Sequence, residues 1–210
     1  MLRPRPEPRL SVVASLLWII RHRAWTGYHL VRYARFVRLR LLHPEVRVEG
    51  LVFLGRGVEL SARPGHGRIV LGAFSHVGDH SRLRAHEGTL RVGAKTVLGR
   101  DVTVNCYLDI DIGASTLVAD SVYICDFDHR FDDLTAPIKD QGIVKSPVHI
   151  GGDCWLGTKV VVLRGTTIDF SPMRRTFRLT DAGATYEIDL TKLKALFFVR
   201  DFEGNDLETT

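Results

Sequence analysis

The sequence contains little sulfur, with 3 cysteines and 2 methionines among its 210 residues. The cysteines are Cys106, Cys125 and Cys154, an odd number without the close pairing typical of zinc sites. This pattern argues against the disulfide framework of a small secreted protein. We expect three reduced thiols that fill buried positions, and no metal site.

Long apolar runs are also missing. The run Leu10–Ile20 has only eleven residues, whereas a helix needs about 20 to cross a bilayer. Arg21, His22 and Arg23 follow it directly, where a signal peptide would carry small residues for cleavage. The sequence therefore predicts neither a transmembrane span nor a cleaved secretion signal, and favours a cytoplasmic protein.

An excess of positive charge is confined to the N-terminal region. The formal net charge is +5 at pH 7, but residues 1–43 alone hold nine arginines and one glutamate. The rest of the chain therefore has a small excess of negative charge. Since no nucleic-acid-binding motif accompanies the basic region, we expect no nucleic-acid partner.

Residues 10–40 have the spacing of a helix. Arginines alternate there with apolar side chains at helical spacing, which are Leu30, Tyr33, Ala34, Val37 and Leu41. Two interpretations remain open. The helix either covers the apolar end of the domain that follows, or lies on an anionic membrane surface through Trp18, Trp25 and its arginines. Liposome flotation of residues 1–45 would separate the two.

Between Val48 and Ile168, aliphatic residues recur in groups of three with a spacing of six. Such a pattern predicts stacked three-sided coils, in which each coil adds one aliphatic side chain to each of three columns. The first column is Val48, Leu71, Val92, Ile112, Ile150 and Ile168. The second is Leu54, Val77, Leu98, Val118 and Leu156. The third is Leu60, Leu83, Val104, Ile124 and Val162.

Small residues usually follow the first two columns. They are Gly72, Gly93, Gly113 and Gly151 after the first, and Gly55, Gly78, Gly99, Ala119 and Gly157 after the second. A tight corner demands a positive φ, which glycine adopts at no steric cost. We therefore expect these glycines to form the corners of the coils.

One connection between coils is far longer than the others, with 20 extra residues between about Cys125 and Pro147. Long loops on a rigid scaffold often carry function. This loop contains one histidine, His129, and the aspartates Asp126, Asp128, Asp132 and Asp133. The residues alone leave two interpretations: a catalytic loop, or a polar loop whose aspartates cap turns.

The coil pattern resembles the hexapeptide-repeat acyltransferases, which fold as a left-handed parallel β-helix. Val148–Thr167 (VHIGGDCWLGTKVVVLRGTT) and Asn105–Asp109 (NCYLD) are similar to the sugar O-acetyltransferase branch. The resemblance covers residues 46–168 and implies an all-β fold, to which the spacing described above adds a helical segment at 1–45. It also implies acetyl transfer from acetyl-CoA to a sugar or related hydroxyl, and a homotrimer with active sites between subunits.

The resemblance also implies roles for individual residues. His129 matches the catalytic histidine. An imidazole with the ordinary pKa of about 6.5 can accept the proton of a hydroxyl group. Asp126, Asp128 or a backbone carbonyl would orient it. Asn105 matches an asparagine that binds the acceptor or the oxyanion, although asparagine also suits a positive-φ corner. The acceptor hydroxyls would meet Asp109, and the acyl donor would meet Trp155, Gly157, Thr158 and Lys159, with Arg164 as a further phosphate contact.

The coil pattern stops at Ile168, where the family continues with further coils that complete the coenzyme A groove. Residues 169–210 predict a small β appendage with strands near 176–180, 184–190 and 195–202, similar to a bacterial β-module of unassigned function. Activity of this chain is therefore open. The alternatives are a non-catalytic scaffold or binding module and, with less support, a zinc enzyme of the same fold, which would need three converging histidines.

Overall fold

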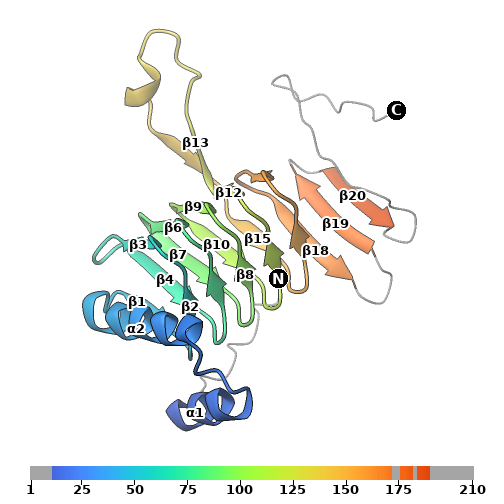
Figure 1. Ribbon diagram of the computed structural model, residues 1–210. Helices are drawn as coiled ribbons and strands as arrows, with labels where there is room; N and C mark the ends of the chain where they lie inside the picture. The colour runs from blue at the N-terminus through green and yellow to red at the C-terminus, as the bar shows by residue number, and fades with distance from the viewer. Residues whose placement is uncertain (1–10, 172–175, 182–183, 190–210) are drawn as a thin grey trace.

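The computed structural model describes residues 11–171, 176–181 and 184–189. Two helices, α1 (Val12–Arg21) and α2 (Gly27–Leu42), precede a solenoid of short strands, and a 3-10 helix (Ile138–Asp140) lies in the long loop. Figure 1 shows the coils stacked along one axis, with α2 beside the first coil and an arm projecting from the later coils.

Three parallel sheets form the sides of the solenoid. The first contains β1 (Val46–Val48), β4 (Gly67–Leu71), β7 (Gly88–Val92), β10 (Asp109–Ile112), β15 (Val148–Ile150) and β18 (Thr167–Ser171). The second contains β2 (Phe53–Leu54), β5 (His76–Val77), β8 (Val97–Leu98), β11 (Leu117–Val118) and β16 (Trp155–Leu156). The third contains β3 (Glu59–Ala62), β6 (Arg82–Ala85), β9 (Thr103–Cys106), β12 (Tyr123–Cys125) and β17 (Val161–Val162).

The register confirms all three predicted columns. In the first sheet Val48 pairs with Leu71, and the pairing continues through Val92, Ile112 and Ile150 to Ile168. The second and third columns pair in the same way along their sheets. Nearly all of these side chains are buried in one continuous core. Burial of these three columns is the main contribution to the stability of the fold, since each aliphatic side chain contributes about 1.5–3 kcal/mol when fully buried.

The prediction that the corner glycines supply positive φ is wrong. The positive φ values fall two residues later, at Phe74, Lys95, Ser115 and Asp153 after the first column and at His80, Asp101, Ser121 and Lys159 after the second. The corner glycines other than Gly157 are needed for close stacking instead. A Cβ on Gly78 would lie 2.1 Å from the carbonyl oxygen of Gly99 on the next coil, which is too close for any side chain.

The N-terminal segment forms two helices where the spacing predicted one. The first helix ends before His22, because Arg23 takes a φ of +48° and the backbone N–H of Ala24 donates to the carbonyl of Ile19. α2 packs on β2, with Leu39 in the solenoid core. α1 makes aromatic contacts through Trp18.

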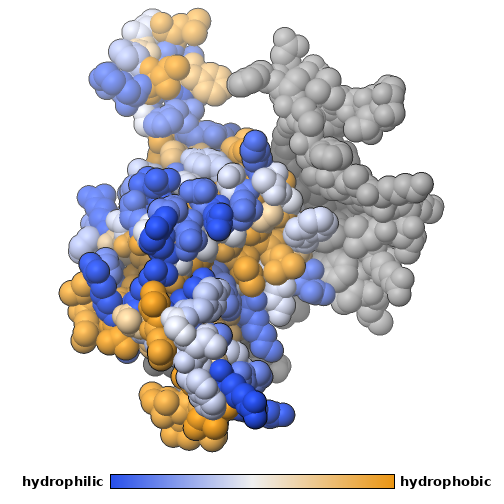
Figure 2. All heavy atoms as spheres, in the orientation of Figure 1, coloured by the Kyte–Doolittle hydropathy of each residue, from blue (hydrophilic) through white to orange (hydrophobic). Residues whose placement is uncertain are grey.

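Most of the apolar surface of α1 faces solvent. The exposed side chains are Val12, Val13, Leu16, Leu17 and Ile20. Figure 2 shows this surface as an apolar patch at the lower end of the molecule. Within the described residues, neither α1 nor α2 has the length and apolarity that a membrane crossing requires.

The C-terminal strands extend the first sheet. β18 pairs in parallel with β15 and antiparallel with β19 (Thr176–Asp181), which pairs antiparallel with β20 (Ala184–Asp189). The predicted appendage is therefore a short antiparallel meander that continues from the last coil. The third predicted strand, at 195–202, lies outside the described residues.

Candidate functional site

The long loop is a hairpin arm that leaves the edge between the third and first sheets. β12 ends at Cys125, and β13 (Phe127–His129) pairs antiparallel with β14 (Ile143–Lys145) to form the arm. Cys125 is the register partner of Asn105 on the coil below. The arm therefore starts at the edge that carries Asn105, and it projects away from the coils (Figure 1).

Asp126 fixes the base of the arm to the coil below. Its side chain is fully buried, and its two carboxylate oxygens accept the backbone N–H groups of Tyr107, Leu108 and Asp109 at 2.7–2.8 Å. Cys106 Sγ also donates to it at 3.5 Å. Because backbone donors occupy both oxygens, this carboxylate shapes the NCYLD segment, and the structure records no bond from it to His129.

Two ion pairs and a ring cluster complete the base of the arm. Arg164 Nε donates to Asp128 Oδ2 at 2.6 Å, and Lys145 pairs with Glu87. The Tyr107 ring stacks on His86 at 4.4 Å between ring centres and meets Phe127 edge-on at 4.5 Å. The start of the arm is therefore held from the coils on both sides of it.

His129 stands at the solvent-exposed end of β13. Its ring centre lies 6.1 Å from that of Phe127, in an edge-on arrangement. In the described part of the chain its imidazole makes no hydrogen bond or ion pair. Both ring nitrogens are therefore open to a ligand, although neither Asp126 nor Asp128 orients the ring in this structure.

Asn105 lies half-buried beside the arm, and its amide Nδ2 donates to Tyr123 Oη at 3.2 Å. Burial raises the pKa of the Tyr123 phenol, so this hydroxyl stays protonated near neutral pH. The amide oxygen of Asn105 takes no part in that bond and can still accept a hydrogen bond. Asp109, at the start of β10, has an exposed side chain on the same edge.

The residues expected to meet the acyl donor lie on a different edge. Trp155 points outward from the second sheet and is 70% exposed. Gly157, Thr158 and Lys159 form the turn from β16 to β17, between the second and third sheets. One chain therefore places Asn105, Asp126 and Asp128 where the arm begins and His129 further along the arm, but does not bring the predicted donor residues to them.

Sequence reasoning missed several residues that build the arm. Arg164 was expected to meet a phosphate, yet it pairs with Asp128. Tyr123 was not considered, although its place in β12 beside Asn105's strand follows from the coil register. His86, which the sequence did not single out, is half-buried and stacks on Tyr107. Only the register combined with the loop's hairpin geometry brings these side chains together.

The three cysteines are buried with free thiols, as expected for wall positions. Burial raises the pKa of Cys154 to about 11 and that of Cys106 still further, so neither thiol is a nucleophile near neutral pH. Among the residues that the structure describes, no group of three or more His, Cys, Asp or Glu side chains is placed to hold a metal ion.

The chain is similar to a probable acetyltransferase of Mycobacterium tuberculosis, with 55% identity over 167 residues. The match covers 80% of this chain and 56% of the relative, so the chain spans little more than half of that protein's length. No protein-family model matches the chain. No solved structure matches it significantly either.

Proposed function

We propose that this chain is a hexapeptide-repeat β-helix acyltransferase that transfers an acetyl group from acetyl-CoA to the hydroxyl of a sugar or a related small molecule. Its stacked parallel coils and its similarity to a probable acetyltransferase support the proposal. The observation that carries the proposal is the arm, which starts at the edge that contains Asn105 and carries the unbonded imidazole of His129.

His129 is the proposed general base. One ring nitrogen takes the proton of the acceptor hydroxyl as its oxygen attacks the thioester carbonyl. The carbon–sulfur bond then breaks, and the imidazolium returns the proton to the leaving thiolate, which yields an acetyl ester and the free thiol of coenzyme A. The Asn105 amide is the proposed group that binds the acceptor or stabilises the oxyanion. Asp109 is the proposed contact for further acceptor hydroxyls.

Asp126 and Asp128 act on this site as positioning residues. Asp126 holds the NCYLD segment that contains Asn105 and Asp109, while Asp128 ties the arm to the next coil through Arg164. Small errors in such positioning cost large factors in rate, because the reacting atoms must meet at about 3–3.5 Å.

Trp155, Gly157, Thr158 and Lys159 are the proposed donor-binding residues. The thioester supplies an activated acetyl group, and an outward tryptophan with a neighbouring lysine suits the pantetheine chain and phosphates of its carrier. Their edge differs from that of His129, so a complete site needs the donor edge of a second copy. This separation supports a homotrimer in which each site lies between subunits.

The first prediction concerns the donor. Saturating acetyl-CoA should raise the midpoint of thermal unfolding, because a ligand at about 100 times its Kd adds roughly 2.7 kcal/mol of stability. The shift should disappear in Trp155→Ala. It should persist in Val97→Ala, an exposed position two coils earlier on the same sheet. A folded wild type without any shift at millimolar acetyl-CoA would favour the scaffold or binding-module alternative.

The second prediction concerns assembly. The tip of the arm exposes Phe131, Leu134 and Ile138, and Leu134 is 97% exposed, so this apolar tip is suited to pack on a neighbouring subunit. Light scattering should give a mass near three times the 23.6 kDa of one chain. Leu134→Asp should lower that mass by favouring dissociation. A wild-type chain that stays monomeric at all concentrations would contradict the trimer.

A further inference from the structure

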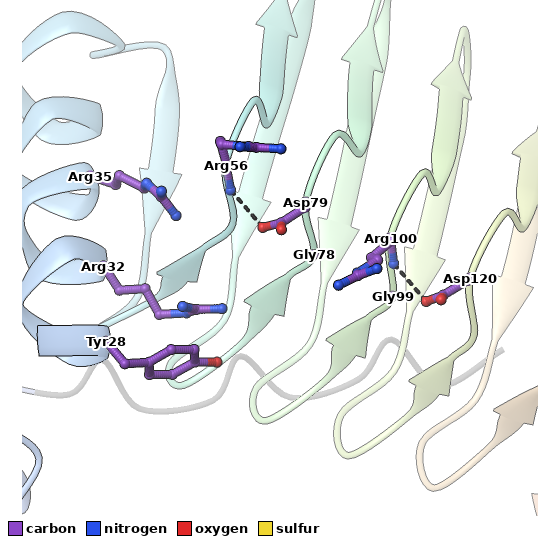
Figure 3. Close-up of a pocket in the computed structure, with 9 residues that line it drawn as sticks. All are labelled: Tyr28, Arg32, Arg35, Arg56, Gly78, Asp79, Gly99, Arg100 and Asp120. Atoms are coloured by element: carbon purple, nitrogen blue, oxygen red, sulfur yellow. Dashed lines mark hydrogen bonds between the residues drawn. The ribbon is translucent and has the colours of Figure 1, made fainter. Parts of the chain in front are cut away.

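A concave site lies between α2 and the edge that joins the second and third sheets, away from the arm. It is an open cleft of about 620 Å³. Figure 3 shows Arg32 and Arg35 projecting from α2 toward the coil corners that carry Arg56 and Arg100. Four arginines from two parts of the chain therefore line one cleft.

The arginine side chains have few partners of their own. The Arg32 guanidinium lies 3.7 Å from the centre of the Tyr28 ring, and Arg35 Nη1 donates to the carbonyl of Leu54 at 3.1 Å. Among the described residues, none of the four arginines forms an ion pair. Arg32 Nε is shielded from solvent and has no hydrogen-bond partner. The structure thus orients the two helix arginines without neutralising them.

Each of the two carboxylates in the cleft already accepts a hydrogen bond at one of its oxygens. Asp79 Oδ1 accepts the backbone N–H of Arg56 at 2.7 Å, and Asp120 Oδ1 accepts that of Arg100 at 2.8 Å. The bond from Arg56 is the main cause of the lowered pKa of Asp79, which therefore stays ionised. Four guanidinium groups and two carboxylates leave an excess of two positive charges. Each carboxylate keeps a second oxygen that can accept a hydrogen bond from a hydroxyl group.

We infer that this cleft binds a phosphate ester that carries hydroxyl groups, with the phosphate between the arginines and the hydroxyls on Asp79 or Asp120. The planar guanidinium fork matches phosphate oxygens in pairs, and an orphaned N–H at the site gains a partner from them. A cleft of this size admits a phosphate with a small organic group. The same chemistry occurs in soluble glycerol phosphate and in the headgroup of an anionic glycerolipid, toward which the exposed apolar face of α1 would also be suited.

The test measures binding of sn-glycerol 3-phosphate by calorimetry, with neutral glycerol as the reference ligand, and co-flotation with phosphatidylcholine vesicles that contain or lack phosphatidylglycerol. The full chain is used throughout. We expect glycerol 3-phosphate to bind, or the anionic vesicles to carry the protein. Comparison of the two assays identifies the source of the phosphate. Arg32→Gln combined with Arg35→Gln should weaken this binding by about tenfold or more.

Two further variants keep the result interpretable. Arg100→Gln removes a cleft arginine whose side chain makes no hydrogen bond in the described structure, so it tests the site even if the helix variant folds poorly. Arg68→Gln removes an exposed arginine from the first sheet and should bind as the wild type does. The inference would be overturned if neither assay showed binding, or if Arg68→Gln and the cleft variants lost affinity equally.

Discussion

His129→Ala should lower the rate of acetyl transfer by about 10²–10⁴-fold, the usual contribution of a general base. The imidazole is exposed and makes no hydrogen bond among the described residues, so its removal should leave the fold and the thermal midpoint unchanged. The measurement is initial rate with acetyl-CoA and a panel of sugars. Binding of acetyl-CoA should survive, because the proposed donor residues lie on another edge.

The matched control is His66→Ala. His66 is an exposed histidine in the turn between β3 and β4, on the same edge of the solenoid but two coils earlier than Asn105. This variant should keep the wild-type rate. Near-wild-type transfer by His129→Ala would end the assignment of the base, and it would leave the proposed donor site and the solenoid itself untouched.

The solenoid could be predicted in detail because its repeating unit is local. Every coil must bury one side chain per side, so a spacing of six appears in the sequence and the columns pair as expected. The position of the arm follows from the same counting. Insertions can occur only where a coil turns, and the one long insertion comes after the third column.

The interactions that hold the site could not be predicted in the same way. Spacing places Asp126 beside His129, and only the fold of the arm turns its carboxylate inward to the backbone of Tyr107–Asp109. The corner glycines show a similar limit. Their spacing was clear, but the reason for it is contact with the next coil, which is a tertiary effect that a single coil does not reveal.

Removal of the Asp126 carboxylate should have the largest effect on stability of any change near the arm. Asp126→Ala leaves three backbone N–H groups beneath the arm without their acceptor. Each unsatisfied buried donor costs about 1–3 kcal/mol, and water entering the space recovers part of that, so we expect a loss of about 3–5 kcal/mol in the free energy of unfolding. Chemical denaturation measured by circular dichroism would give this value directly. Activity should fall too, because the same N–H groups belong to the segment that positions Asn105 and Asp109.

Asp128→Ala provides the comparison, since it removes an aspartate only two positions away. Its partner is Arg164, and both side chains are about two-fifths exposed, so the pair should contribute less than about 1 kcal/mol. Asp126→Asn should lie between the two variants, because the amide keeps one acceptor oxygen but turns an N–H donor toward the backbone donors. Equal losses for Asp126→Ala and Asp128→Ala would mean that the buried carboxylate does not hold the arm. The base of the arm would then depend on its ring contacts and on the Lys145–Glu87 pair instead.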